Sequence, residues 1–146
     1  MCQVRSYPGE LFPVNSVSEH HIPQFLARNR RVVLAIDSPT FGRVSMVMVA
    51  AMIVGRVTVS GIAQRDVPIG THAMRRELAT GDEVAMFHLG STVVMFCEAR
   101  VPRLDRALGP ILMGAPLWPP QSDHAAPPKP TDSDEGAARN ERLPNE

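Results

Sequence analysis

Two apolar runs separated by a turn most constrain the fold of this chain. Residues 32–36 are rich in β-branched side chains and end at Asp37-Ser38-Pro39, and residues 43–54 form a longer run of valine and methionine. Apolar runs bounded by turn residues are typical of strands, and a run without a polar face is typical of a strand buried on both faces. The pair predicts strands at 31–37 and 43–54, the second of them central in a sheet.

The same pattern continues along the first hundred residues. Val57 and Val59 alternate with polar residues up to Gly61, and apolar segments stand on either side of Gly90. These patterns predict further strands at 4–7, 56–60, 83–89 and 92–98. Residues 62–79 show little periodicity and are expected to form a surface loop with a helical turn near 74–78. A short helical turn capped by Ser16 or Ser18 is expected before Pro23. The predicted fold class is mostly β, a single small antiparallel or mixed domain resembling a barrel or sandwich.

Composition changes near the end of the chain. From Pro119 onward, proline and charged residues dominate and apolar residues are few. Such a segment buries too little surface to offset its ordering entropy. We therefore expect one domain over residues 1–118 and a disordered tail over residues 119–146.

Charge and cysteine content exclude several classes of function. Fifteen basic residues balance fifteen acidic ones, so no overall field attracts nucleic acid. Cys2 and Cys97 have no paired spacing, which argues against a disulfide framework or a zinc site and predicts no metal. We expect no secretory leader, and the longest apolar stretch, residues 44–54, is too short to span a bilayer.

The segment Leu89-Gly90-Ser91-Thr92 lies between two apolar segments. A Gly-Ser pair within a strand pattern ordinarily marks a bulge. With Gly81-Asp82-Glu83 before it and Cys97-Glu98 after it, however, the run resembles the self-cleavage motif of the phosphatidylserine decarboxylases. These pyruvoyl enzymes cut their own chain between a glycine and a serine.

Other segments resemble the C-terminal part of the same proenzymes, in the family's order. They are residues 7–15 with the Pro-Gly, Leu-Phe and Val-Asn signature, residues 25–33 with Ala-Arg-Asn, Phe41-Gly42, and residues 46–55. Together with the Gly-Ser motif they cover most of residues 7–98. The chain departs from the family at Arg30, where an acid is usual, at Ala50, where glycine is usual, and at Arg56, where serine is common.

The resemblance implies a function and its site residues. The chain would convert phosphatidylserine to phosphatidylethanolamine, with Gly90 and Ser91 as the cleavage site. Ser91 would become a covalent pyruvoyl group, the cofactor, which forms a Schiff base with the substrate amine. The expected partners are phosphatidylserine, a membrane surface, and an upstream decarboxylase segment or a second copy, but no nucleic acid. The expected location is peripheral, on the cytoplasmic face of the cell membrane, with docking through exposed apolar side chains and arginines such as Arg28, Arg30 and Arg31.

The residues also bear on this chemistry independently of the family. Decarboxylation of an amino acid leaves a carbanion that a carbonyl cofactor can delocalise. Pyridoxal phosphate needs a lysine, but the one lysine of the chain, Lys129, lies in the predicted tail. The same absence argues against a lipoyl or biotinyl carrier domain. Gly90 suits self-cleavage because a missing Cβ opens its carbonyl and permits a strained dihedral.

The base that would activate Ser91 is left open. His88 is near in sequence, but strand alternation points it away from Ser91, and His72 lies in the predicted loop. The family's relay histidine and aspartate lie upstream of residue 1, and His20-His21 does not match that histidine. We therefore expect Met1 to be an internal start or the chain to be a shortened paralogue. Two functions remain: an active decarboxylase, or a truncated fragment that does not mature and acts as a lipid-binding or structural protein.

Overall fold

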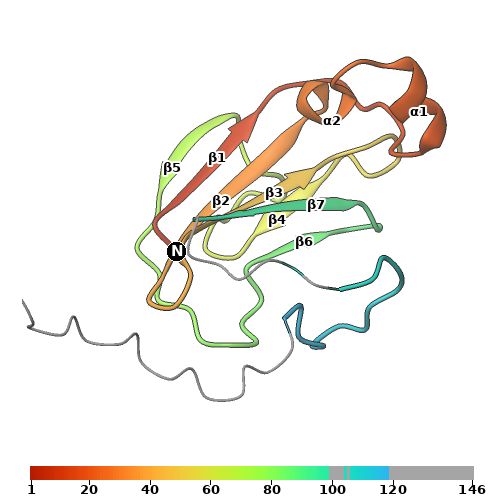
Figure 1. Cartoon of the computed structure of the whole chain (residues 1–146). Coiled ribbons are helices and arrows are strands. Elements are labelled where there is room, and N and C mark those ends of the chain that lie inside the picture. The colour runs from red at the N-terminus through yellow and green to blue at the C-terminus, as the bar shows by residue number, and fades with distance from the viewer. Residues whose placement is uncertain (99–103, 105, 119–146) are drawn as a thin grey trace, which may run out of the picture. The chain divides into compact units, whose positions relative to one another are not determined.

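The computed structural model describes residues 1–98, 104 and 106–118. The chain divides into two compact units, Met1–Arg103 and Leu104–Glu146. In the second unit, residues 104 and 106–118 contain no helix or strand, and the predicted tail at 119–146 lies outside the described residues. The first unit holds all the described elements (Figure 1). They are β1 (Gln3–Tyr7), α1 (Ser16–His21), α2 (Phe25–Arg28), β2 (Arg31–Ser38), β3 (Gly42–Val49), β4 (Val57–Val59), β5 (Gly70–Ala73), β6 (Ala85–Phe87) and β7 (Thr92–Cys97).

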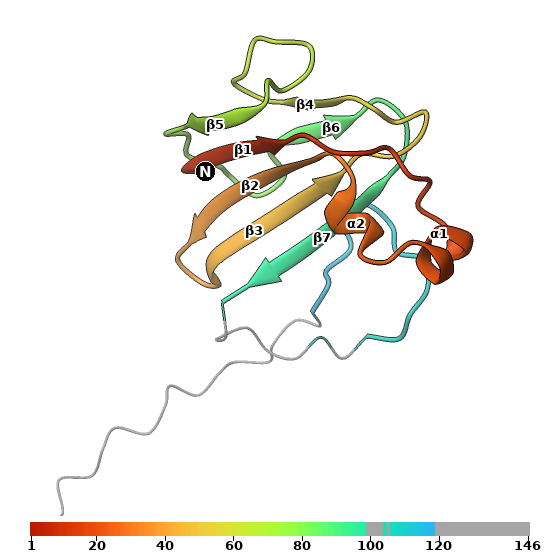
Figure 2. The same ribbon diagram turned by 90° about the horizontal axis from the view of Figure 1, so that it is seen from above.

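Two antiparallel sheets make up the first unit. The larger has five strands in the order β5-β1-β2-β3-β7, which Figure 2 shows side by side, and the smaller pairs β4 with β6. The mostly β, antiparallel fold predicted from the sequence is confirmed. The larger sheet stays open, with β5 and β7 at its edges.

The core lies between the two sheets. Val32 and Leu34 of β2 alternate inward and pack with Val57 and Val59 of β4. Met1, Val4, Met48 and Val67 complete the buried cluster. Burial of these side chains holds the small sheet against the large one. Complete burial of side chains of this size contributes about 1.5–3 kcal/mol each.

The central hairpin is formed as expected, but its second strand is shorter than predicted. β2 and β3 pair in continuous register from Arg31 opposite Val49 to Ser38 opposite Gly42. The predicted strand at 43–54 ends at Val49 because Ala51 and Val54 exchange backbone hydrogen bonds and close a tight turn. The predicted strands at 56–60 and 83–89 are likewise shorter, as β4 and β6.

The segment predicted to be a loop contains a strand. Residues 70–73 form β5, which pairs with β1, and the predicted helical turn at 74–78 is absent. The short sequence of β5, Gly-Thr-His-Ala, shows no alternation of apolar and polar residues. Pairing with β1, and not a local sequence preference, therefore accounts for this strand. The helix α1 is present, but its cap is Asn15, whose side chain accepts a hydrogen bond from Ser18 N. The four-residue helix α2 was not predicted.

Candidate functional site

The Gly90–Ser91 peptide bond lies in the connection between the two sheets. β6 ends at Phe87 in the two-stranded sheet, and β7 begins at Thr92 in the five-stranded sheet. Gly90 is exposed, and Ser91 is half-buried against the larger sheet. The predicted meeting of two strands at this pair is therefore confirmed, with the addition that the strands belong to different sheets.

Ser91 is fixed against the end of β3. Its Oγ donates a hydrogen bond to Val49 O at 2.7 Å, and the next residue, Thr92, pairs with Val49 in the ladder between β3 and β7. Among the described residues 1–98, Val49 O is the hydrogen-bond partner of Ser91 Oγ. Val49 had no functional signal in the sequence, because its contribution is a backbone oxygen 42 residues away.

Gly90 leaves open the space that a side chain would occupy at this position. A Cβ built on Gly90 would meet no atom within 4 Å, and its φ lies outside the left-handed region. The left-handed backbone that a glycine permits is therefore not adopted at Gly90. What the structure provides is an exposed Gly90 with free space at the position of a Cβ.

Asn29 joins several segments that carried the family resemblance. It is completely buried, accepts a hydrogen bond from Phe12 N, and donates to Phe12 O and Ala50 O at 2.9 and 3.0 Å. Gly9 packs so closely on the backbone of residues 28–30 that a Cβ would overlap Arg28 O. These contacts fix the end of β3, beside the carbonyl of Val49 that holds Ser91. We refer to these contacts of Asn29 and Gly9 as the Asn29 clamp. The Asn of the Ala-Arg-Asn segment was its signal in the sequence.

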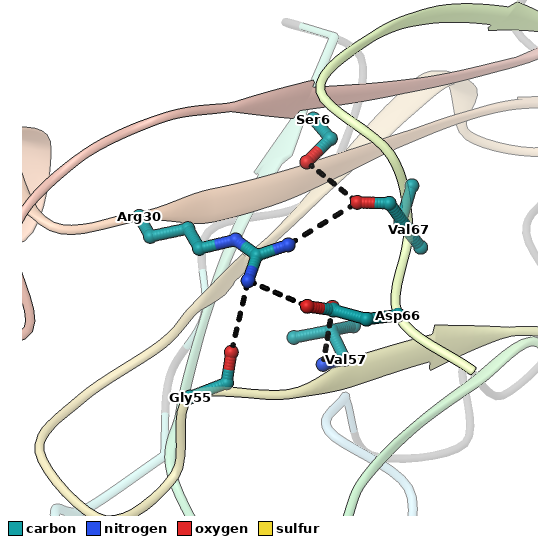
Figure 3. A network of polar contacts seen from close by, with 6 residues as sticks. All are labelled: Ser6, Arg30, Gly55, Val57, Asp66 and Val67. Atoms are coloured by element: carbon teal, nitrogen blue, oxygen red, sulfur yellow. Dashed lines mark hydrogen bonds and ion pairs between the residues drawn. The ribbon is translucent and has the colours of Figure 1, made fainter. Parts of the chain in front are cut away.

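Arg30 forms a second clamp on the same region (Figure 3). Its guanidinium pairs with Asp66 at 2.6 Å and donates to Gly55 O and Val67 O. With a side-chain exposure of 23%, Arg30 supports the protein's own loops, a role that the sequence did not indicate. Arg28 and Arg31 lie over the rings of Phe12 and Tyr7, respectively.

The structure separates the two histidines considered as bases from the Ser91 hydroxyl. His72 lies in β5, at the opposite edge of the sheet from β7, and its ring nitrogen contacts Pro68 O. His88 is exposed and lines an open groove of about 560 Å³ together with Arg56 and Leu89. Neither imidazole is hydrogen-bonded to Ser91 in the described part of the chain. The same part contains no group of three side chains that could hold a metal ion.

Comparison with known proteins identifies the family. The family model described as phosphatidylserine decarboxylase matches residues 1–114. The phosphatidylserine decarboxylase proenzyme of Acinetobacter baylyi is 38% identical over 94 residues, covering 62% of this chain and 32% of the relative. That of Vibrio cholerae serotype O1 is 35% identical over 122 residues, covering 75% and 42%. That of Salmonella paratyphi C is 32% identical over 154 residues, covering 94% and 48%.

The chain thus spans less than half the length of these curated relatives. The match nevertheless includes the two clamps and the Gly90–Ser91 connection, all within residues 1–114. The chain belongs to the phosphatidylserine decarboxylase family.

Proposed function

We propose that this chain is the part of a phosphatidylserine decarboxylase that carries the self-cleavage site, and that the Gly90–Ser91 bond is cut to generate a pyruvoyl group from Ser91. The observation that carries the proposal is the pairing of a fixed serine with an open glycine. Ser91 Oγ is held at Val49 O, while Gly90 is exposed and has free space at the position of a Cβ. Chain cleavage requires a nucleophile held next to the carbonyl that it attacks, and Ser91 directly follows Gly90.

The cleavage uses atoms that the chain itself supplies. Ser91 Oγ gives up its proton and attacks the Gly90 carbonyl carbon. The Gly90–Ser91 C–N bond then breaks as the Ser91 nitrogen takes up a proton, which leaves an ester and a free amine. Removal of the Ser91 α-proton and cleavage of the Cβ–Oγ bond release the Gly90 carboxylate and leave a dehydroalanine. Water then replaces its nitrogen, ammonia leaves, and a pyruvoyl group remains at the new N-terminus.

The residues present fit such a group. The pairing of Thr92 with Val49 would keep the new N-terminus at the start of β7, and the space at Gly90 would admit a substrate amine. The pyruvoyl carbonyl supplies an electron sink for decarboxylation, as carbonyl cofactors do. We propose phosphatidylserine as the substrate and phosphatidylethanolamine as the product.

The proton of Ser91 Oγ needs an acceptor. Val49 O accepts a hydrogen bond but is not basic enough to take the proton, so the hydroxyl is a poor nucleophile in this arrangement. We propose that an upstream decarboxylase segment supplies the histidine and aspartate that activate it. The same observation supports the second candidate, in which this chain remains uncut and acts as a lipid-binding or structural protein.

We further propose that the protein works at the cytoplasmic face of the cell membrane as a peripheral protein, since its proposed substrate is a bilayer lipid. Neither helix in the described ranges has the length and apolar content to cross a membrane. In this proposal, attachment uses surface side chains of the β body.

Intact-mass spectrometry tests the proposed function. The chain expressed alone should keep its full mass, and co-expression with the N-terminal half of a family member should yield fragments that end at Gly90 and begin with pyruvoyl. Borohydride should then trap phosphatidylserine on the second fragment. Ser91→Ala should abolish cutting and trapping. A co-expressed chain that folds, binds the N-terminal half and still remains uncut would support the non-maturing candidate instead.

A further inference from the structure

The turn after β3 presents two apolar side chains to solvent. Ala51 N donates to Val54 O, and Val54 N donates to Ala51 O, so Met52 and Ile53 form the tip. Ala51 and Val54 are buried, whereas Met52 is 56% and Ile53 81% exposed. The turn therefore projects apolar surface while its base is held in the core.

Ile53 also has an unfavourable backbone conformation. Its φ is +74°, in the left-handed region. At this position of a four-residue turn, glycine or asparagine is the usual residue with such a φ. A β-branched residue is a genuine outlier there. Since the Ile53 side chain is exposed, packing within this unit does not explain why an apolar, strained residue stands at the tip.

A cationic groove adjoins the tip. Ile53, Val54 and Gly55 line one part of the open groove of about 560 Å³, and Arg56, His88 and Leu89 complete its lining. Leu89 is 55% exposed and directly precedes Gly90. Arg56 is exposed and makes no ion pair or hydrogen bond to another residue in the ranges that the structure describes. The surface thus combines apolar side chains with an available guanidinium.

The base of the tip is held rigidly. Gly55 O accepts a hydrogen bond from Arg30, whose guanidinium is itself fixed by Asp66 and Val67 O (Figure 3). The Asn29 side chain bonds Ala50 O on the other side of the turn. Both clamps therefore hold the apolar tip in one conformation, so little ordering entropy is lost when it binds.

We propose that Met52, Ile53 and Leu89 form an apolar tip that enters the interface of an anionic phospholipid bilayer, while Arg56, with His88 beside it, binds the lipid phosphate in the groove. Apolar side chains flanked by a free arginine are complementary to acyl chains beneath an anionic headgroup layer. The inference rests on the proposed function, which needs a bilayer lipid near Ser91. It assigns the docking surface to the turn after β3 together with the connection that contains the cleavage site.

Vesicle sedimentation with the full, uncut chain tests the tip. Vesicles of phosphatidylcholine with phosphatidylglycerol provide an anionic surface without the proposed substrate. Ile53→Gly should weaken binding about tenfold, because the apolar side chain is lost. The same variant should melt at the same or a higher temperature, because glycine relieves the unfavourable φ. Val17→Ser, which alters an exposed valine of α1, is the control and should leave binding unchanged.

Arg56→Ser tests the phosphate contact. It should weaken binding about fivefold, the effect expected of one arginine near an anionic surface. Arg75→Ser removes the same charge beyond β5, at the other end of the sheet by register, and should have little effect. Equal effects of Arg56→Ser and Arg75→Ser would show a general charge effect and overturn the assignment of the groove.

Two results would overturn the proposal altogether. One is failure of the wild-type chain to bind these vesicles, and the other is equal binding by wild type and Ile53→Gly. Binding is measured without cleavage or decarboxylation, so these failures are distinct from failure of the proposed function. If co-expression with the N-terminal half still gives cutting at Gly90, the proposed function stands and only the docking surface is rejected.

Discussion

Ser91 Oγ donates a hydrogen bond to Val49 O at 2.7 Å, across a sequence separation of 42 residues. The bond fixes the serine beside β3 but leaves its proton on oxygen, because a peptide carbonyl is a very weak base. The same contact therefore positions the residue proposed for cleavage and accounts for an uncut chain when no stronger base is present.

Ser91→Ala should lower the free energy of unfolding of the uncut chain by about 1 kcal/mol, because the hydrogen bond is partly buried. Urea denaturation followed by circular dichroism measures the change. Ser60→Ala is a matched control, since Ser60 Oγ donates to Glu83 O at 3.0 Å in an exposed position. A loss for Ser60→Ala as large as that for Ser91→Ala would contradict the role given to the Val49 contact.

Asn29→Asp should destabilise the protein by about 3 kcal/mol or more at neutral pH. The new carboxylate would face Phe12 O and Ala50 O in a completely buried site, where Asn29 now donates to both oxygens. Asn15→Asp is the control, because Asn15 acts as an acceptor at the start of α1 and aspartate caps equally well. Chemical denaturation of both variants provides the comparison. Similar losses for the two would show that Asn29 does not act through its donors.

Gly9→Ala and Gly90→Ala should have opposite consequences for folding. A Cβ at Gly9 would overlap the backbone of Arg28 and Arg30, so this variant should be strongly destabilised, whereas a Cβ at Gly90 would meet nothing. Gly90→Ala should keep its melting temperature within a few degrees and slow cutting when the upstream half is supplied. Thermal melts and intact mass measure the two effects. A stable Gly9→Ala variant would show that the segment moves away easily.

Arg30→Lys should lower the free energy of unfolding by about 1–2 kcal/mol although it keeps the charge. One ammonium cannot reproduce the fork that contacts Asp66, Gly55 O and Val67 O together. Arg43→Lys is the control, since its pair with Asp37 is exposed on both sides. Equal denaturation midpoints for the two variants would argue against the clamp.

Acid should remove the small contribution of the Asp37–Arg43 pair. The hydrogen bond from Arg43, followed by that from Cys2, holds the pKa of Asp37 below its usual value. A carboxyl whose pKa is lower in the folded state stabilises the protein above its unfolded pKa and loses that effect as the pH falls through the folded value. Asp37→Asn should therefore be less stable than wild type at pH 7, and the difference should disappear as the pH falls through the lowered pKa of Asp37 in the folded state. High salt should shrink it at pH 7.

The sequence by itself determined the β class and the central hairpin. The β-branched run of β2 and the apolar run of β3 are separated by turn residues, so local preference and burial favour the same structure. The sequence also placed Gly90 and Ser91 between two strands, because apolar segments flank them. The residues proposed for cleavage were identified from this local pattern and its family resemblance.

Tertiary structure decided where β3 ends, that β5 exists, and what Ser91 contacts. The apolar run continues past Val49, but the turn from Ala51 to Val54 interrupts it, with Ile53 at a φ that its own preferences disfavour. β5 forms because its backbone pairs with the edge of β1. The Ser91 contact with Val49 depends on ladder pairing between residues far apart in the chain. Such pairings are set by burial and register across the whole sheet, so a local reading of the chain does not contain them.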